Sequence, residues 1–216
     1  MKNDRSRCIW VMAVIVGTLV IRVGLLMHYG VAIGGDTMTY LNHADNIISS
    51  GLGFYYDHIG TIWYWGYPTF LALIFSVIGQ NLFTVALIQT VLISLTCVLL
   101  YKLMVYLGCK EILAVMLTLF YSLNFDVNMW DRYILSDCMG MFWECICLFC
   151  FYRLFLIKMD ENRIDGRWMT LWITSGMIFF SARSNAISLI LGMIMILLFS
   201  IENKKTRRIY IWGASY

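Results

Sequence analysis

The sequence predicts an all-α polytopic membrane protein with about six transmembrane helices and an outer-face loop that carries short interfacial helices. The chain has 216 residues, of which 61% are hydrophobic and only 13% are charged. An ordinary soluble domain has about 25% charged residues, so this composition excludes that class. Several apolar runs reach the length of about 20 helical residues that crosses a bilayer core. The positions of the basic residues then orient these runs.

The first predicted span covers residues 8–29 and follows a basic head at residues 1–7. A cleavable signal peptide is the competing interpretation, but no small-residue cleavage site follows the apolar run and more spans come after it. We therefore expect a retained signal-anchor helix. The chain reads as a single transmembrane domain over residues 1–216, made of the first span at 8–29, an outer segment at 30–81 and the remaining helices at 82–201.

The basic residues favour a cytoplasmic N-terminus for a multi-pass protein of the plasma membrane. With the predicted spans, 13 of the 16 Lys and Arg residues fall on one side. Cytoplasmic loops carry such an excess of positive charge. Only Arg22, Arg132 and Arg183 lie within a span or on the outer side. The spans in chain order are 8–29, 82–104, 111–127, 134–157, 168–182 and 185–201.

Three stretches need a separate argument. A single helix over residues 168–201 would be roughly 51 Å long, which exceeds the bilayer core, so we expect two helices that meet at residues 181–185. Residues 66–79 are apolar but number only 14, which predicts a helix that lies at or dips into the outer interface. Residues 208–216 read as the start of a further span, which predicts that the chain is the N-terminal part of a larger protein.

The outer segment contains no Lys or Arg between residues 30 and 80, yet it carries acidic, phenolic and imidazole side chains. Asp36, Tyr40 and His43 recur at positions i, i+4 and i+7, which places them on one face of a helix. They would then direct a carboxylate, a phenol and an imidazole at one place. Asp36 also suits the N-terminus of that helix, where a carboxylate accepts backbone N–H groups. The spacing alone leaves capping and catalysis equally open.

Asp57 and His58 form a second polar pair, between the aromatic runs 54–56 and 63–65. Tyr and Trp are common at the membrane–water boundary, which accounts for most of these rings. The adjacent carboxylate and imidazole could instead bind a divalent metal ion or move a proton. Two neighbouring residues are a weak signal for a metal. The seven cysteines show no paired zinc-ligand spacing with histidines, and no basic patch indicates a nucleic-acid partner.

Five charged residues remain to be placed. Arg132 lies in the second outer loop, and Asp137 begins the following span, with Glu144 seven residues later on the same face. A carboxylate at mid-membrane costs about 2.5–3.5 kcal/mol on insertion scales, so Glu144 should face the bundle interior, and Arg22 is its structural partner in the simpler interpretation. Arg183, at an outer turn, suits a phosphate, although it could also reach lipid headgroups by snorkelling.

Taken in order, these features resemble the GT-C class of polytopic glycosyltransferases, which includes protein O-mannosyltransferases and lipid A aminoarabinose transferases. The resemblance covers most of residues 8–201 and begins with the basic head and first span. Each motif is short, and the order and spacing of the motifs carry the likeness. The motifs are Gly35-Asp36 with Tyr40, the turn at 51–56, Trp65-Gly66-Tyr67-Pro68, the span start at 81–89 and Ile134-Leu135-Ser136-Asp137.

The resemblance implies an enzyme that moves a sugar from a polyprenyl-phosphate-linked donor to a lipid, glycan or protein acceptor on the non-cytoplasmic face of the membrane. Asp36 matches the catalytic carboxylate of the family, as a general base or as a ligand of the divalent metal ion that some members use. Asp137 matches a second acidic residue, which is often Glu in the family. The expected substrate-binding residues are Tyr40, His43, Asp57, His58, Arg132 and Arg183.

Two other classes of function stay open at this point. In a transporter or flippase-like protein, Arg22, Glu144 and Arg183 would form a polar pathway through the membrane. In a non-catalytic homologue or fragment, the chain would assemble with a partner. Members of the resembled class usually have more spans and often a C-terminal extramembrane part. Loss of transfer on replacing Asp36 would favour the enzyme, whereas a stronger dependence on Arg22 and Glu144 would favour transport.

Overall fold

The protein is helical throughout the residues that the structure describes. The computed structural model describes residues 2–60, 65–124, 129–157 and 166–202. Within these ranges the β interactions are limited to one isolated parallel bridge, between Ala32 and Tyr133. This result confirms the predicted all-α class. The end of the predicted span at 111–127 and most of the basic C-terminal tail lie outside the described residues.

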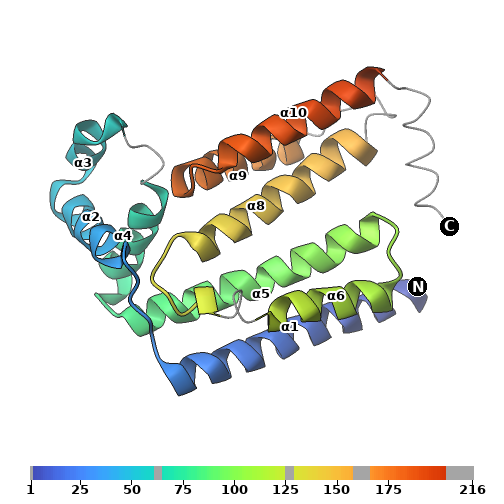
Figure 1. Cartoon of the computed structure of the whole chain (residues 1–216), viewed down its shortest axis with the longest axis horizontal. Coiled ribbons are helices and arrows are strands. Elements are labelled where there is room, and N and C mark those ends of the chain that lie inside the picture. Colours follow the sequence, from blue (N-terminus) through green and yellow to red (C-terminus); the bar gives the residue numbers. More distant parts are fainter. Residues whose placement is uncertain (1, 61–64, 125–128, 158–165, 203–216) are drawn as a thin grey trace.

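The longer helices pack side by side and alternate in direction (Figure 1). The contacts between neighbours join α1 to α5 and α6, α5 to α8, and α8 to α9. The predicted break at 181–185 is confirmed, because one helix ends at Ala182 and the next begins at Ala186. The elements are α1 Lys2–Tyr29, α5 Leu82–Tyr106, α6 Glu111–Leu123, α8 Asp137–Phe151 with a π-helical continuation Tyr152–Ile157, α9 Gly166–Ala182 and α10 Ala186–Glu202.

Three shorter helices gather at one end of this bundle and form what we call the cap (Figure 1). They are α2 Thr37–Ser50, α3 Leu52–Asp57 and α4 Gly66–Ile78. Helix α4 packs against α2 and against α9, so the cap is attached to the bundle through α4. The cap corresponds to the predicted outer segment, and α4 confirms a short helix at 66–78. Its depth in a membrane stays a prediction.

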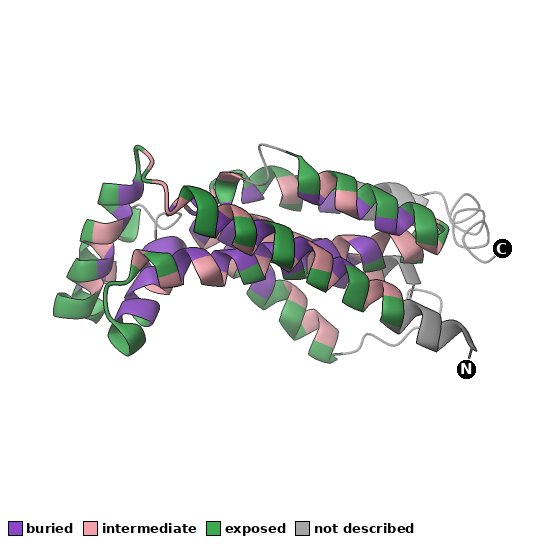
Figure 2. Ribbon diagram, turned by 90° about the horizontal axis from the view of Figure 1, so that it is seen from below, coloured by how far each residue is buried: buried purple, intermediate pink, exposed green. Residues whose placement is uncertain are grey.

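Burial follows stripes along the inner faces of the helices, with exposed residues on the outside (Figure 2). Many outward side chains are large and apolar, among them Val20, Val77 and Phe120. Such exposure is expected where lipid rather than water surrounds the bundle. Two helices of the described chain, Ile9–Tyr29 and Leu82–Tyr106, are long and apolar enough to cross a membrane. The apolar helices at 66–78, 111–123 and 186–195 are shorter, so the six-span count stays a prediction.

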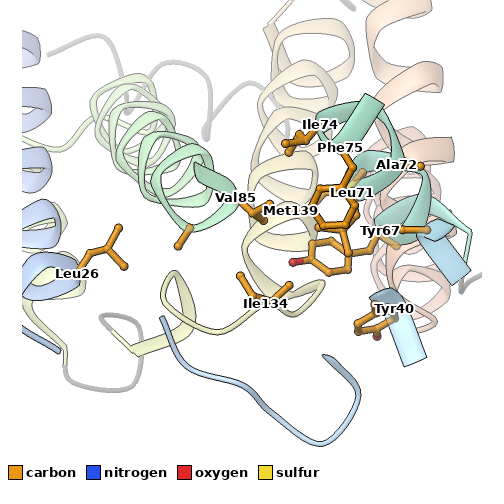
Figure 3. Close-up of a cluster of buried hydrophobic side chains, with 13 residues drawn as sticks. Leu26, Tyr40, Tyr67, Leu71, Ala72, Ile74, Phe75, Val85, Ile134 and Met139 are labelled. Carbon is orange, nitrogen blue, oxygen red and sulfur yellow. The ribbon is translucent and has the colours of Figure 1, made fainter. Parts of the chain in front are cut away.

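A cluster of buried hydrophobic side chains joins the cap to the bundle (Figure 3). Tyr67 and Leu71 of α4 pack in this cluster with Met139 of α8. Helix α4 starts directly against the end of α9: a Cβ added to Gly66 would lie 2.5 Å from Ser181 Oγ and 2.9 Å from Ala182 N. Glycine at this position therefore allows the two helices to meet. The junction sets the position of the α9–α10 turn relative to the cap.

Candidate active site

Residues 129–136 form a connecting strap that leads into α8 and ties the cap to the bundle. The strap runs beside the chain that follows α1: Ala32 N–H donates to Arg132 O at 2.9 Å, and Ile134 N–H donates to Ala32 O at 3.3 Å. The Thr37 hydroxyl donates to Ile134 O at 3.1 Å, which adds the start of α2. Because Asp137 follows this strap immediately, the position of the strap determines the position of Asp137.

A buried ion pair fixes one end of the strap. Arg22 Nη1 of α1 donates to Asp131 Oδ2 at 3.0 Å, and the two side chains are 0% and 1% exposed. The Thr90 hydroxyl of α5 donates to the same carboxylate oxygen at 3.3 Å. Burial raises the pKa of the Asp131 carboxyl, although the Arg22 charge and its hydrogen bond oppose this shift. The alternative in which Arg22 pairs with Glu144 is wrong, because Asp131 is nearer in space despite its position in a loop.

A buried amide holds the strap from a second side. Gln89 Nε2 of α5 donates to Asp131 O at 3.1 Å and to Tyr133 O at 2.7 Å. Its Oε1 accepts from the Tyr67 hydroxyl at 2.5 Å. Both hydrogens and the oxygen of the amide are therefore used, which satisfies a polar group that would otherwise be costly to bury. Gln89 links the strap to α4 and hence to the cap.

The strap delivers Asp137 to Arg183. Arg183 Nη1 lies 2.6 Å from Asp137 Oδ1, and the side chains are 38% and 18% exposed. Asp137 is the first residue of α8, and Arg183 lies in the turn between α9 and α10. Gly140 leaves room for the arginine, since a Cβ there would come within 2.8 Å of Arg183 Cγ. Two residues that the sequence singled out separately are thus direct partners on the cap side of the bundle.

Tyr40 of α2 lies next to this pair. Its hydroxyl is 3.4 Å from Ser136 Oγ, and its ring meets the Tyr67 ring edge-on with centroids 5.0 Å apart. Burial raises the pKa of Tyr40, and the hydrogen bond with Ser136 opposes the shift. The charges of the neighbouring Asp36, Arg183 and Asp137 also act on this phenol. Tyr40, Asp36, Asp137 and Arg183 therefore share one electrostatic environment.

Asp36 sits at the N-cap position of α2 but its side chain makes no capping hydrogen bond. The nearby turn is closed by Thr37 instead, whose hydroxyl accepts from Gly34 N–H at 2.9 Å. The Asp36 side chain is exposed. The capping interpretation is therefore wrong for this carboxylate, which stays exposed one helical turn before the buried Tyr40. Its catalytic role stays a prediction.

The two histidines of the cap gather at α3. The His43 and His58 rings have centroids 5.4 Å apart, and both pack on Phe54. His58 Nδ1 lies 2.9 Å from Phe54 O, and burial together with the His58 charge lowers the pKa of His43. Asp57 is exposed beside them. Across the described residues, no group of three His, Cys, Asp or Glu side chains is arranged to hold a metal ion.

Arg132 and Glu144 lie apart from the Asp137–Arg183 pair. The Arg132 guanidinium is buried over the ring of Tyr29, at 5.0 Å from the ring centroid. Glu144 is half-buried in α8, two turns after Asp137. The predicted site residues thus divide into three places: Asp36, Tyr40, Asp137 and Arg183 around the start of α8, His43 with His58 and Asp57 at α3, and Arg132 at the end of α1.

Sequence reasoning did not assign functional roles to Gln89, Thr90 and Ser136. A signal was present for the first two, because adjacent side chains of Gln and Thr in an otherwise apolar span must find hydrogen-bond partners. No signal identified Ser136 as a partner of Tyr40, since the two residues are 96 positions apart. Only the folded strap brings them together.

Comparison with known proteins places the chain in a family. The model of dolichyl-phosphate-mannose-protein mannosyltransferase matches residues 8–201. No curated protein and no solved structure matches the chain. The family consists of integral membrane glycosyltransferases of the GT-C class, which use polyprenyl-phosphate-linked sugar donors. Because the match covers most of its length, the chain belongs to the dolichyl-phosphate-mannose-protein mannosyltransferase family.

Proposed function

We propose that this chain transfers a sugar from a polyprenyl-phosphate-linked donor to a lipid, glycan or protein acceptor on the non-cytoplasmic face of the plasma membrane, with its own N-terminus in the cytoplasm. The observation that carries the proposal is the Asp137–Arg183 pair at 2.6 Å. Together with the exposed Asp36, it provides two carboxylates and one cation next to Tyr40. Transfer from a phosphate-linked sugar needs a proton acceptor and a positive group.

The proposed reaction assigns one task to each charge. An acceptor hydroxyl attacks the anomeric carbon of the sugar, and the bond from that carbon to the phosphate oxygen breaks. Asp36 accepts the hydroxyl proton as general base. The bond electrons leave with the polyprenyl phosphate, whose developing charge Arg183 stabilises through its guanidinium. Tyr40 lines the site, and its raised pKa keeps the phenol protonated as a hydrogen-bond donor.

The partial exposure of Asp137 and Arg183 supports an exchange of partners. Because both side chains are partly exposed, this pair costs less to open than the fully buried Arg22–Asp131 pair, and a phosphate can replace Asp137 on Arg183. Donor binding would then free the Asp137 carboxylate, which can orient the sugar or the acceptor. We assign no step to a metal ion, because the described residues offer no three-ligand set for one. His43, His58, Asp57 and Arg132 stay in the proposal as more distant substrate contacts.

The test compares purified wild type with Asp36→Asn and Arg183→Gln in liposomes that contain a panel of polyprenyl-phosphate sugars, with candidate acceptors added. The measurement is the release of free polyprenyl phosphate. We expect wild type to release it from at least one donor. Asp36→Asn should reduce the rate by about 100-fold or more, because general-base catalysis contributes on the order of 10²–10⁴.

Asp45→Asn is the matched control, since Asp45 lies on the same helix and its exposed side chain bonds only Gln80 among the described residues. It should keep the wild-type rate. Normal release by Asp36→Asn would overturn its role as base. A lack of release by wild type from every donor and acceptor would favour the non-catalytic homologue over the enzyme.

A further inference from the structure

Glu144 is a charged side chain of the bundle that has no role in the proposed reaction. It is half-buried in α8, seven residues after Asp137. A carboxylate in a predicted membrane span is costly without a partner and indicates a functional position. Arg22, its partner in the simpler interpretation, is bound to Asp131 instead. Over the described ranges the Arg–Asp pairs leave Glu144 without an ion pair of its own.

Asp137 and Glu144 lie on one face of α8 with Gly140 between them. Residues seven apart in a helix lie nearly above one another. With a rise of 1.5 Å per residue, Gly140 follows Asp137 by about 4.5 Å and precedes Glu144 by about 6 Å along the axis. Met141, which also lies between the two carboxylates, is directed to α6, where its sulfur accepts from the Tyr121 hydroxyl at 3.4 Å. Gly140 has no side chain, so the surface between the two carboxylates is free for another residue.

The side chain of Arg183 occupies this surface. A Cβ added to Gly140 would lie 2.8 Å from Arg183 Cγ and 3.6 Å from its Cδ. Beyond Cδ the guanidinium is turned to Asp137, with Nη1 2.6 Å from Oδ1. Side chains on a helix lean toward its N-terminus, so the Glu144 carboxylate extends back toward Gly140. The Arg183 charge acts on the Glu144 carboxyl. The methylene groups of Arg183 therefore lie between two carboxylates, of which the guanidinium contacts one.

The guanidinium of Arg183 has donors to spare for a second anion. Arginine carries five N–H donors in a planar fork, and over the described ranges the hydrogen bond of this guanidinium uses Nη1. In the proposed reaction the donor phosphate displaces Asp137 from Arg183. The partly exposed arginine would then lose its anchor on the protein at the moment when it must hold the phosphate. A carboxylate on its bundle side can provide that anchor.

We propose that Glu144 is a positioning residue, which accepts a hydrogen bond from the Arg183 guanidinium when the donor phosphate has displaced Asp137. Glu144 holds the arginine from the bundle side, and the phosphate binds the arginine from the cap side. This inference rests on the proposed function, because the displacement of Asp137 by phosphate is part of it. The pairing of Arg183 with Glu144 requires no transfer, however, and loss of the Asp137 charge should produce it without a donor.

The first test measures the coupling by thermal unfolding of the detergent-purified full chain without donor. In wild type Arg183 is bound to Asp137, so Glu144→Gln should leave the Tm unchanged or raise it. In the Asp137→Asn background Arg183 should turn to Glu144, and adding Glu144→Gln should lower the Tm by about 2–4 °C. Adding Arg183→Gln to Asp137→Asn should abolish this effect. An equal effect of Glu144→Gln with and without the Asp137 carboxylate would overturn the proposal.

The second test adds polyprenyl phosphate, which should raise the Tm of wild type because a ligand of the folded state stabilises it. Glu144→Gln should lose half or more of this rise. Glu144→Asp, which keeps the charge on a shorter side chain, should restore part of it and serves if Glu144→Gln does not fold. Asp45→Asn is the matched control and should keep the full rise.

The outcomes separate the two proposals. An equal rise for wild type and Glu144→Gln would overturn the role of Glu144 and leave the donor site in place. A wild type that neither responds to polyprenyl phosphate nor releases it from any donor would overturn the proposed function, and with it the donor-bound role of Glu144.

Discussion

Two Arg–Asp ion pairs lie on the cap side within the part of the chain that the structure describes, and they differ in burial. The buried pair, Arg22 with Asp131, is 0% and 1% exposed and has further partners in Thr90 and Ser122. The open pair, Arg183 with Asp137, is 38% and 18% exposed. A buried pair cannot be broken cheaply, whereas an open pair can exchange partners with a ligand. The first is suited to holding the strap and the second to binding substrate.

The largest expected effect is on the buried pair. Asp131→Ala leaves the Arg22 guanidinium without its carboxylate in a buried position, which typically costs about 3–5 kcal/mol of stability. We expect a correspondingly lower Tm in detergent and loss of transfer, because the strap no longer fixes Asp137. The measurement is thermal unfolding of the purified variant.

The open pair provides the control for this prediction. Asp137→Asn should change stability by less than about 1 kcal/mol while still reducing transfer. The double variant Arg22→Met with Asp131→Leu should recover much of the stability, since apolar residues of similar volume can replace a buried pair. Equal destabilisation by Asp131→Ala and Asp137→Asn would remove the distinction between the two pairs.

The second effect concerns the amide that holds the strap. Gln89→Leu leaves two backbone carbonyls and the Tyr67 hydroxyl without this partner, and we expect a loss of about 2–3 kcal/mol. Gln80→Leu is the matched control, because Gln80 is an exposed glutamine that bonds Asp45; it should stay within about 0.5 kcal/mol of wild type. Thermal unfolding checks both. A wild-type Tm for Gln89→Leu would show that the buried pair holds the strap alone.

The third effect is at the junction of α4 and α9, which positions the open pair. Gly66→Ala places a methyl group against Ser181 Oγ and the backbone of residues 181–182, so we expect a loss of about 1–3 kcal/mol through overpacking. Gly24→Ala in α1 has no atom within 4 Å of the new Cβ and should be neutral or slightly stabilising. The measurement is the Tm of each variant relative to wild type. An unchanged Tm for Gly66→Ala would mean that α4 and α9 can move apart to accommodate the methyl group without loss of stability.

The local features of this architecture were predictable, and the long-range pairings were not. The helix break at 181–185 and the short helix at 66–78 followed from length and polarity, which depend on neighbouring residues. The partners of Arg22 and Arg183 could not be predicted in this way, because they lie 109 and 46 positions away in the sequence. The simpler interpretation of Glu144 paired it with Arg22, but the strap folds back and brings Asp131 to Arg22.

In the cap too, local features could be predicted from the sequence and long-range contacts could not. Helical periodicity predicted that Tyr40 and His43 share one face of α2 and are directed at one place. In the structure Tyr40 lies beside Ser136, whereas His43 packs on Phe54 and His58. The periodicity could not show that α3 folds onto His43 and separates it from the Asp137–Arg183 pair. The sequence correctly indicated Asp36 as an N-cap position, but its carboxylate does not make the expected capping hydrogen bond. The Thr37 hydroxyl closes the turn instead, by accepting from Gly34 N–H.

The smallest expected effect is a pH dependence of the cap. Burial disfavours the charged form of His43, and the neighbouring His58 adds repulsion, so its folded-state pKa lies below the ordinary value of 6.5. The unfolded chain then binds more protons between these two values. The stabilisation from neutral His43 is complete above pH 6.5 and is lost as the pH falls through the folded-state pKa. His43→Phe keeps a ring against Phe54 but takes up no proton, so its Tm should fall less than that of wild type between pH 7 and pH 5. An identical slope for the two proteins would show that protonation of His43 does not loosen α3.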